Sequence, residues 1–230
     1  MKKKIKKLIL LLIILYFIVQ NLSPENYTPI ALSQNPNYIG KGQEKIFNNQ
    51  EYFTTFTTIA DNQKVYKEYK QNGNTPWANN SYWGGTMTEN GCGITAMAII
   101  LSAYNYNLTP EDLREKYYPV LNYKNFSKEL SIEFNIENSD FYYDSIHLSN
   151  PKLQEHLKSN RPILICVWNE EKANRWTESS HYMVLLASDE NNMVYVSNPN
   201  GLENDKKSSG WYNINEITPY IAKALYIEKY

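Results

Sequence analysis

Cysteine and histidine are scarce in this chain, which has two cysteines and three histidines among 230 residues. It has no CxxC or HxxxH spacing, and so lacks the usual ligand patterns of a metal site. Two cysteines allow at most one disulfide, between Cys92 and Cys166, and two free thiols are the alternative. We therefore expect a function that depends on side chains alone, without a metal or another cofactor.

Clusters of basic residues are also missing from most of the chain. Five of the 23 Lys and Arg residues are lysines within the first seven positions. Beyond residue 22 there are 18 basic and 24 acidic residues, a net charge of −6. A mildly acidic body without a basic run lacks the electrostatic footprint of a nucleic-acid-binding protein, so we expect no nucleic-acid partner.

The longest uninterrupted apolar run is Leu8–Val19, and it follows the basic cluster Met1–Lys7. This order is typical of an export signal. The run of 12 residues is shorter than the ~20 residues that a relaxed membrane span needs. No small-x-small cleavage site follows closely and no lipobox cysteine is present, so both a cleaved signal peptide and an uncleaved anchor remain open. Either one places the rest of the chain outside the cytoplasm.

The composition divides the chain into three parts. Residues 1–22 are the predicted signal peptide or signal anchor. Residues 23–42 are rich in Asn, Pro, Ser and Gln without hydrophobic periodicity, which is typical of an extracellular tether. Residues 43–230 are predicted to form one folded domain, because this length supports one hydrophobic core.

Hydrophobic patterns and caps predict the elements of this domain. Apolar residues on nearly every face of Cys92–Tyr104 indicate a buried central helix. Proline after a capping residue, at Thr109-Pro110 and Asn150-Pro151, marks the start of two more helices, the second running to Ser159. Strands are predicted around Glu51–Ala60, Pro162–Trp168, His181–Ala187, Met193–Ser197 and Ile221–Ile227. A helix-rich first half and a strand-rich second half predict an α+β domain.

The two cysteines lie in different surroundings. Cys166 falls inside the apolar run Pro162–Trp168, where a thiol behaves as a small hydrophobic group. Cys92 stands between two glycines at the head of the predicted central helix. A helix N-terminus favours the thiolate, and the glycines allow close approach of a substrate to the Cys92 N–H. Cys92 is therefore the candidate nucleophile, with plain packing as the alternative.

His181 is the candidate base for this thiol. It stands at the start of a predicted strand, where its ring can face a cleft while the following residues are buried. His147 lies in a polar stretch and His156 on the predicted exposed side of its helix, so we expect both to be solvated.

An asparagine is predicted to hold the His181 ring. If a two-residue turn joins His181–Ala187 to Met193–Ser197, antiparallel pairing places Asn198 opposite His181. A four-residue turn over Asp189–Asn192 places Asn200 there instead. Either amide can fix the tautomer of the ring, as in a Cys-His-Asn triad. A simple turn residue before Pro199 is the alternative for Asn198.

Several short motifs occur together in a fixed order. They are Tyr69-Lys70-Gln71, Pro76-Trp77-Ala78, Gly91-Cys92-Gly93-Ile94-Thr95-Ala96-Met97-Ala98, Thr109-Pro110, Asn160-Arg161-Pro162-Ile163, Trp176-Thr177, His181-Tyr182 and Asn198-Pro199. In this order and spacing the chain resembles the stand-alone C39-like peptidase family of the papain-like superfamily. The resemblance implies a papain-like fold in which the central buried helix bears the nucleophile and packs on an antiparallel sheet. It also implies cleavage of amide bonds without a metal, with Cys92 and His181 as the central pair.

The resemblance implies roles for two further residues. Gln71, which lies 21 residues before Cys92, corresponds to the glutamine that completes the oxyanion hole of papain-like enzymes. Trp176 corresponds to a tryptophan that shields the histidine–asparagine contact from water. The chain departs from the family pattern at Asn198, where the family usually has Asp, and at Ile94 and Ser180, where it usually has Pro and Gly. An asparagine preserves the geometry but stabilises the imidazolium less than a carboxylate does.

The sequence therefore predicts an extracytoplasmic cysteine peptidase that cleaves peptide or isopeptide bonds. One alternative keeps the thiol chemistry in a cell-wall amidase or transpeptidase. The other is a papain-like binding module that no longer turns over. The expected partners are a peptide or protein substrate, cell-wall peptides as one form of it, and the membrane through the N-terminal segment.

Overall fold

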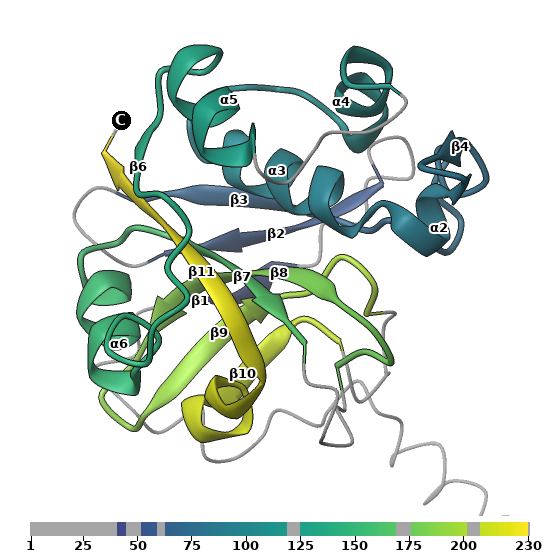
Figure 1. The fold of residues 1–230 in the computed structure, drawn as a ribbon. Coiled ribbons are helices and arrows are strands. Elements are labelled where there is room, and N and C mark those ends of the chain that lie inside the picture. The colour runs from purple at the N-terminus through teal and green to yellow at the C-terminus, as the bar shows by residue number, and fades with distance from the viewer. Residues whose placement is uncertain are drawn as a thin grey trace, which may run out of the picture. The chain divides into compact units, whose positions relative to one another are not determined.

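The computed structural model describes residues 41–44, 52–58, 63–118, 125–168, 176–201 and 208–229 (Figure 1). The predicted export segment, residues 1–22, lies outside the described residues. The first described strand, β1 (Lys41–Glu44), spans the predicted boundary between tether and domain, and the position of that boundary stays a prediction. Within the described ranges, no helix combines the length and the apolar character that crossing a membrane requires.

A six-stranded antiparallel sheet forms the centre of the domain. Its strand order is β10 (Gly210–Asn213), β9 (Met193–Ser197), β8 (His181–Ser188), β7 (Ile163–Val167), β11 (Ile221–Lys229) and β6 (Glu137–Asn138). Every residue of β7 and β8 is buried. Both faces of the sheet are therefore covered, which explains why these strands read as continuous apolar runs instead of alternating patterns.

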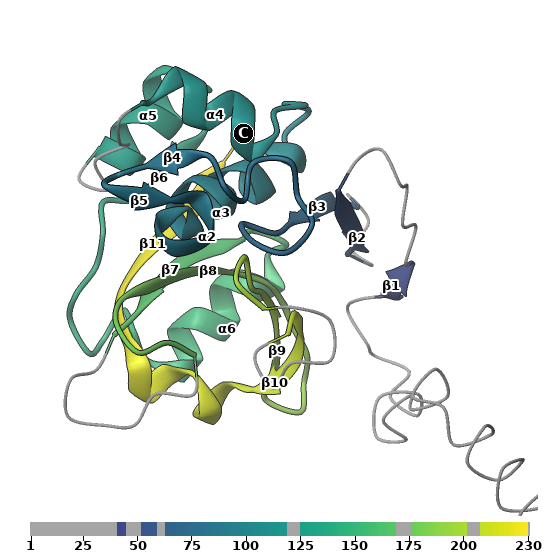
Figure 2. The ribbon, with the colours of Figure 1, turned by 90° about the vertical axis from the view of Figure 1, so that its right-hand side faces the viewer.

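Helix α3 (Cys92–Ser102) covers one face of this sheet and packs against β8 (Figure 2). All residues from Ile94 to Leu101 are buried, as the pattern without a polar face predicts. Its other side packs against β3 (Val65–Tyr69), which belongs to a three-stranded sheet in the order β1, β2 (Phe53–Thr57), β3. Phe56 of β2 stacks on Tyr195 of β9 at 3.8 Å between ring centroids, so the two sheets share one core.

The opposite face of the six-stranded sheet is covered by α6 (Asn150–Lys158) and the 3₁₀ helices η3 (Ile214–Glu216) and η4 (Thr218–Tyr220). Here one prediction was wrong: His156 is 7% exposed instead of solvated. The buried stripe of α6 consists of Leu153, His156 and Leu157, which are spaced at i, i+3 and i+4. The His156 ring packs edge-on against Tyr226 of β11 at 4.6 Å.

The remaining elements surround the start of α3. They are the hairpin β4 (Ser81–Tyr82) and β5 (Gly85–Thr86), and the helices α2 (Met87–Asn90), α4 (Pro110–Lys116) and α5 (Phe126–Ile132). Thr109 caps α4 as predicted and forms a capping box with Asp112. The cap of α6 is Ser149, one residue before the predicted Asn150. Helices combined with antiparallel sheets confirm the predicted α+β class.

Next to its loop the β8–β9 hairpin has neither of the two predicted turns, because Ala187 pairs with Tyr195 and Ser188 with Val194. Its loop spans Asp189–Asn192, and the Asp189 carboxylate accepts the backbone N–H groups of Asn191 and Met193 at 2.8 Å each. Val184 pairs with Ser197 and Leu185 with Val196, which is the register of the four-residue turn. The register shifts by one residue between Leu185 and Ala187, so this hairpin also contains an irregularity that the sequence did not predict.

Candidate active site

Cys92 is the first residue of α3 and is half-buried. Packing leaves little room at the glycines beside it, and least at Gly91. A Cβ on Gly91 would lie 2.5 Å from the Met87 carbonyl oxygen, and a Cβ on Gly93 would lie 3.3 Å from the Phe126 ring. The close turn from α2 into α3 therefore depends on small residues, in addition to the substrate access that we predicted. Both cysteines of the chain are free thiols, which excludes the disulfide alternative in this structure.

The environment of the Cys92 thiol differs from the prediction in one respect. Burial raises the pKa of the thiol, whereas the helix N-terminus was expected to lower it. Backbone N–H groups of Tyr182, Gly93 and Cys92 itself act in the opposite direction and hold the pKa down in part. Desolvation is the larger effect, so the pKa of the thiol is raised above its ordinary value. The Tyr182 contact also places the Cys92 thiol beside the second residue of β8.

His181, the first residue of β8, is 3% exposed and contacts Asn198. The Nε2 atom of the ring lies 2.7 Å from Oδ1 of Asn198, which is itself fully buried. The backbone N–H of Asn200 donates to the same Oδ1 at 2.9 Å, which identifies this atom of the amide as the oxygen. An oxygen can only accept, so Nε2 carries the proton. Nδ1 is then the basic nitrogen of the neutral ring.

The structure separates the two candidate asparagines. Strand pairing ends at Ser197. If it continued in the same register, Asn200 would lie opposite His181. The chain leaves the sheet at Asn198-Pro199 for two reasons. Asn198 Oδ1 accepts the backbone N–H of Asn200, and Pro199 has no backbone N–H to donate to a neighbouring strand. The side chain of Asn200 instead accepts a hydrogen bond from Asn72 at 2.7 Å. The amide that holds the ring is therefore that of Asn198.

Gln71 connects the Asn198 loop to the segment before Cys92. It is 2% exposed, and its backbone N–H donates to the Pro199 carbonyl at 2.9 Å. Its side-chain Nε2 donates to the Thr88 carbonyl in α2 at 2.7 Å. The buried Oε1 has no partner within the described part of the chain. One N–H of the Gln71 amide group is thus used by α2.

Trp176 lies in the apolar cluster on the α6 side of the sheet. This cluster also contains Val167, the residue paired with His181, and Met183. The indole N–H of Trp176 donates to the Glu216 carbonyl at 3.4 Å, and its ring packs edge-on against Tyr212 at 4.8 Å. The shielding of the His181–Asn198 contact by Trp176 stays a prediction.

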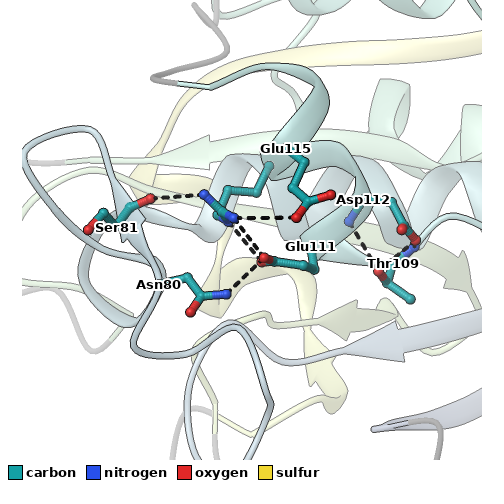
Figure 3. A network of polar contacts seen from close by, with 7 residues as sticks. Asn80, Ser81, Thr109, Glu111, Asp112 and Glu115 are labelled. Atoms are coloured by element: carbon teal, nitrogen blue, oxygen red, sulfur yellow. Dashed lines mark hydrogen bonds and ion pairs between the residues drawn. The ribbon is translucent and has the colours of Figure 1, made fainter.

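A polar network fixes the loop that leads into α2 (Figure 3). Glu111 of α4 accepts hydrogen bonds from Asn80 at 2.8 Å and from two nitrogens of Arg114 at 2.7 and 2.8 Å. Arg114 also reaches the Ser81 carbonyl at 3.4 Å. This network was not predicted from the sequence, because Asn80 and Glu111 are 31 residues apart and meet only in the folded chain.

Two further residues that the sequence did not indicate bind the backbone of Asn198. Lys70 Nζ donates to the Asn198 carbonyl at 2.7 Å, and Ser209 Oγ accepts the Asn198 N–H at 3.0 Å. Lys70 was noted only as part of the motif Tyr69-Lys70-Gln71. No local pattern could reveal a partner 128 residues away.

Comparison with known proteins adds a family to this geometry. No curated protein sequence matches the chain. Among solved structures, the chain is similar to the crystal structure of a C39-like peptidase from Bacillus anthracis, with 14% identity over 62% of this chain and 90% of that chain and a TM-score of 0.43. The model of the Peptidase_C39 like family matches residues 63–218, which include Gln71, Cys92, His181 and Asn198. With this match over about two thirds of its length, the chain belongs to the Peptidase_C39 like family.

Proposed function

We propose that the protein is a cysteine peptidase that cleaves peptide or isopeptide bonds with Cys92, His181, Asn198 and Gln71. The observation that carries this proposal is the 2.7 Å contact between His181 Nε2 and Asn198 Oδ1. It fixes the tautomer in which Nδ1 is basic. The thiol of Cys92 is held beside the same strand end by the Tyr182 N–H. The nucleophile helix α3 packed against β8 supports a papain-like arrangement.

In the proposed mechanism, His181 acts as a general base. Because burial raises the pKa of the Cys92 thiol, a preformed thiolate is not the resting state. His181 Nδ1 takes the thiol proton as the sulfur attacks the carbonyl carbon, and the resulting imidazolium is held by Asn198. The Cys92 N–H and the second N–H of Gln71 stabilise the oxyanion. The imidazolium then protonates the leaving amine, and a water activated by His181 hydrolyses the thioester.

We further propose that this chemistry takes place outside the cytoplasm. The basic cluster and apolar run of residues 1–22 support export, with the segment either removed or kept as an anchor. Substrates would then be exported peptides or proteins, or the peptides of the cell wall. The acidic body of the chain supports a non-nucleic-acid partner.

The test is thiol-dependent hydrolysis by the purified protein on three substrates: a peptide panel, an isopeptide-linked substrate and cell-wall material. We expect Cys92→Ser and His181→Ala to abolish turnover, while Cys166→Ser, which changes the other free thiol, leaves it within about twofold. Release of cell-wall stem peptides without cleavage of the peptide panel would favour the amidase or transpeptidase. Absence of turnover on all three substrates would favour the binding module and overturn the proposal.

A further inference from the structure

Two segments of three residues each bind one another: residues 70–72, with Gln71 in the middle, and residues 198–200 in the loop that begins with Asn198. Lys70 Nζ donates to the Asn198 carbonyl at 2.7 Å, and the Gln71 N–H donates to the Pro199 carbonyl at 2.9 Å. Asn72 Nδ2 then donates to the carbonyl and the side-chain oxygen of Asn200, at 2.9 and 2.7 Å. The segments are 128 residues apart in sequence and are joined over their whole length.

Ser209 completes the contacts on Asn198. Its Oγ accepts the Asn198 N–H at 3.0 Å and accepts a second hydrogen bond from Lys70 Nζ at 2.9 Å. Both backbone polar groups of Asn198 are therefore held, the carbonyl by Lys70 and the N–H by Ser209. The two holding groups also bind each other, so neither can move without the other.

The Lys70 ammonium is itself held in a largely buried place. The Lys70 carbonyl accepts the indole N–H of Trp77 at 2.7 Å, which fixes the backbone. Burial lowers the pKa of Lys70, and the Glu68 carboxylate opposes this shift. Glu68 is 1% exposed and accepts a hydrogen bond from Tyr195 at 3.0 Å. A buried ammonium is costly unless it is paired, and two oxygens plus a nearby carboxylate meet that condition.

We propose that Lys70 and Ser209 are positioning residues of the peptidase site, which hold the backbone of Asn198 so that its side chain keeps His181 in the productive tautomer and orientation. This inference rests on the proposed function and adds two residues to it. A hydrogen bond of 2.7 Å between His181 and Asn198 breaks when Asn198 moves by about 1 Å, and misplacement of that size costs on the order of 100-fold in rate. Neither residue needs to touch the substrate.

The experiment uses the full chain and compares Lys70→Met and Ser209→Ala with the matched control Lys67→Met. Lys67 lies on β3, which ends one residue before Lys70, and its ammonium binds the exposed Asn107 side chain. We expect Lys70→Met to lower kcat by about 100-fold and Ser209→Ala by about 10-fold, each with KM changed less than about twofold. Lys67→Met should match the wild type in both constants.

The discriminating measurement repeats both substitutions in an Asn198→Ala background. If Lys70 and Ser209 act through Asn198, they should lower kcat no further there. The same loss of kcat in both backgrounds would indicate a general structural role and overturn the inference, as would unchanged kcat in the single variants. Ser209→Ala removes only a hydroxyl and carries the test by itself where Lys70→Met does not fold. A wild type without thiol-dependent turnover would instead contradict the proposed function.

Discussion

At the scale of single residues, the neighbours of Cys92 and His181 determine which atoms of these two side chains carry a proton. The Cys92 thiol has two opposing influences, burial and three backbone N–H groups, and burial prevails. His181 has its Nε2 proton fixed by one oxygen, and this oxygen is fixed by the Asn200 N–H. The proposed chemistry therefore needs the base at the moment of attack, because the nucleophile is not ionised in advance.

Alkylation of Cys92 by iodoacetamide tests this view of the thiol. Because burial raises its pKa above the ordinary value of 9.0, the rate should be low at pH 7 and should still be rising at pH 9. Cys166 is the internal comparison, since burial raises its pKa to about 11. In the Cys92→Ser variant, alkylation should therefore be slower at every pH. A plateau for Cys92 below pH 7 would indicate a preformed thiolate and contradict the general-base mechanism.

The sequence indicated the residues of the site that carry local signals. Cys92 stands out by its glycines and helix, and His181 by its place at a strand end. The choice between Asn198 and Asn200 could not be made, because it depends on where strand pairing ends and not on turn length alone. Lys70 and Ser209 carry no signal, since their partner is brought to them only by the folded chain.

At the scale of elements, the position of Cys92 depends on the short connection from β4 through α2 into α3. The hairpin turn at Trp83-Gly84 has positive φ angles of 49° and 76°, and such a conformation is rare for a bulky residue such as Trp83. Trp83 therefore gives no signal for a turn, and the hairpin was not predicted from the glycines that follow it. Asn90 in α2 binds the carbonyls of Tyr82 and Trp83 at 3.2 and 3.1 Å, which ties the hairpin to the helix.

The network of Glu111, Arg114 and Asn80 should stabilise this connection (Figure 3). We expect Arg114→Met to lower the free energy of unfolding by about 1–2 kcal/mol, because Glu111 loses its charged partner while it stays half-buried. Urea denaturation measures this change. Lys152→Met removes the exposed pair with Glu155 and should cost less than about 0.5 kcal/mol. Equal effects of the two substitutions would show that the network has no special role.

The hydrogen bond and charge of Arg114 lower the pKa of Glu111 below its ordinary value of 4.5. The stability that this pair contributes is therefore fully present above about pH 4.5. It is lost as the pH falls through the lower pKa that Glu111 has in the folded protein. The loss caused by Arg114→Met should shrink in the same range. Unchanged loss at low pH would show that the effect comes from packing of the Arg114 side chain.

At the scale of the whole molecule, the sequence predicted the layers better than their edges. The apolar central helix packed on an antiparallel sheet was predicted, and the unbroken apolar runs of β7 and β8 are explained by cover from α3 on one face and α6 on the other. His156 was misplaced because a histidine at position i+3 of an apolar stripe looks polar in the sequence but is buried in the fold. Strand β10 and helix α5 were not predicted, since their short polar-rich sequences have no clear period.

The burial of His156 makes the stability of the domain depend on pH. Burial lowers the pKa of His156 to about 4, the charge of Arg161 acts in the same direction, and backbone contacts with Ile227 and Pro162 oppose the shift only in part. In the unfolded chain His156 has its ordinary pKa of 6.5, so it binds a proton at a pH where the folded chain does not. The free energy of unfolding should therefore decrease as the pH falls from 6.5 to about 4. The loss is at most about 3 kcal/mol. Urea denaturation of the wild type across this range measures it.

His156→Phe keeps a ring against Tyr226 but cannot be protonated, so its stability should change much less between pH 6.5 and 4 than that of the wild type. His147→Gln is the matched control, because His147 is partly exposed and binds Asp144 at the surface. In that variant the free energy of unfolding should depend on pH near pH 5 as it does in the wild type, because unfolding is still coupled to protonation of the buried His156 ring. If His156→Phe also retained the slope, another buried group would have to be the source, and the contact between α6 and β11 would not determine the acid limit of the fold.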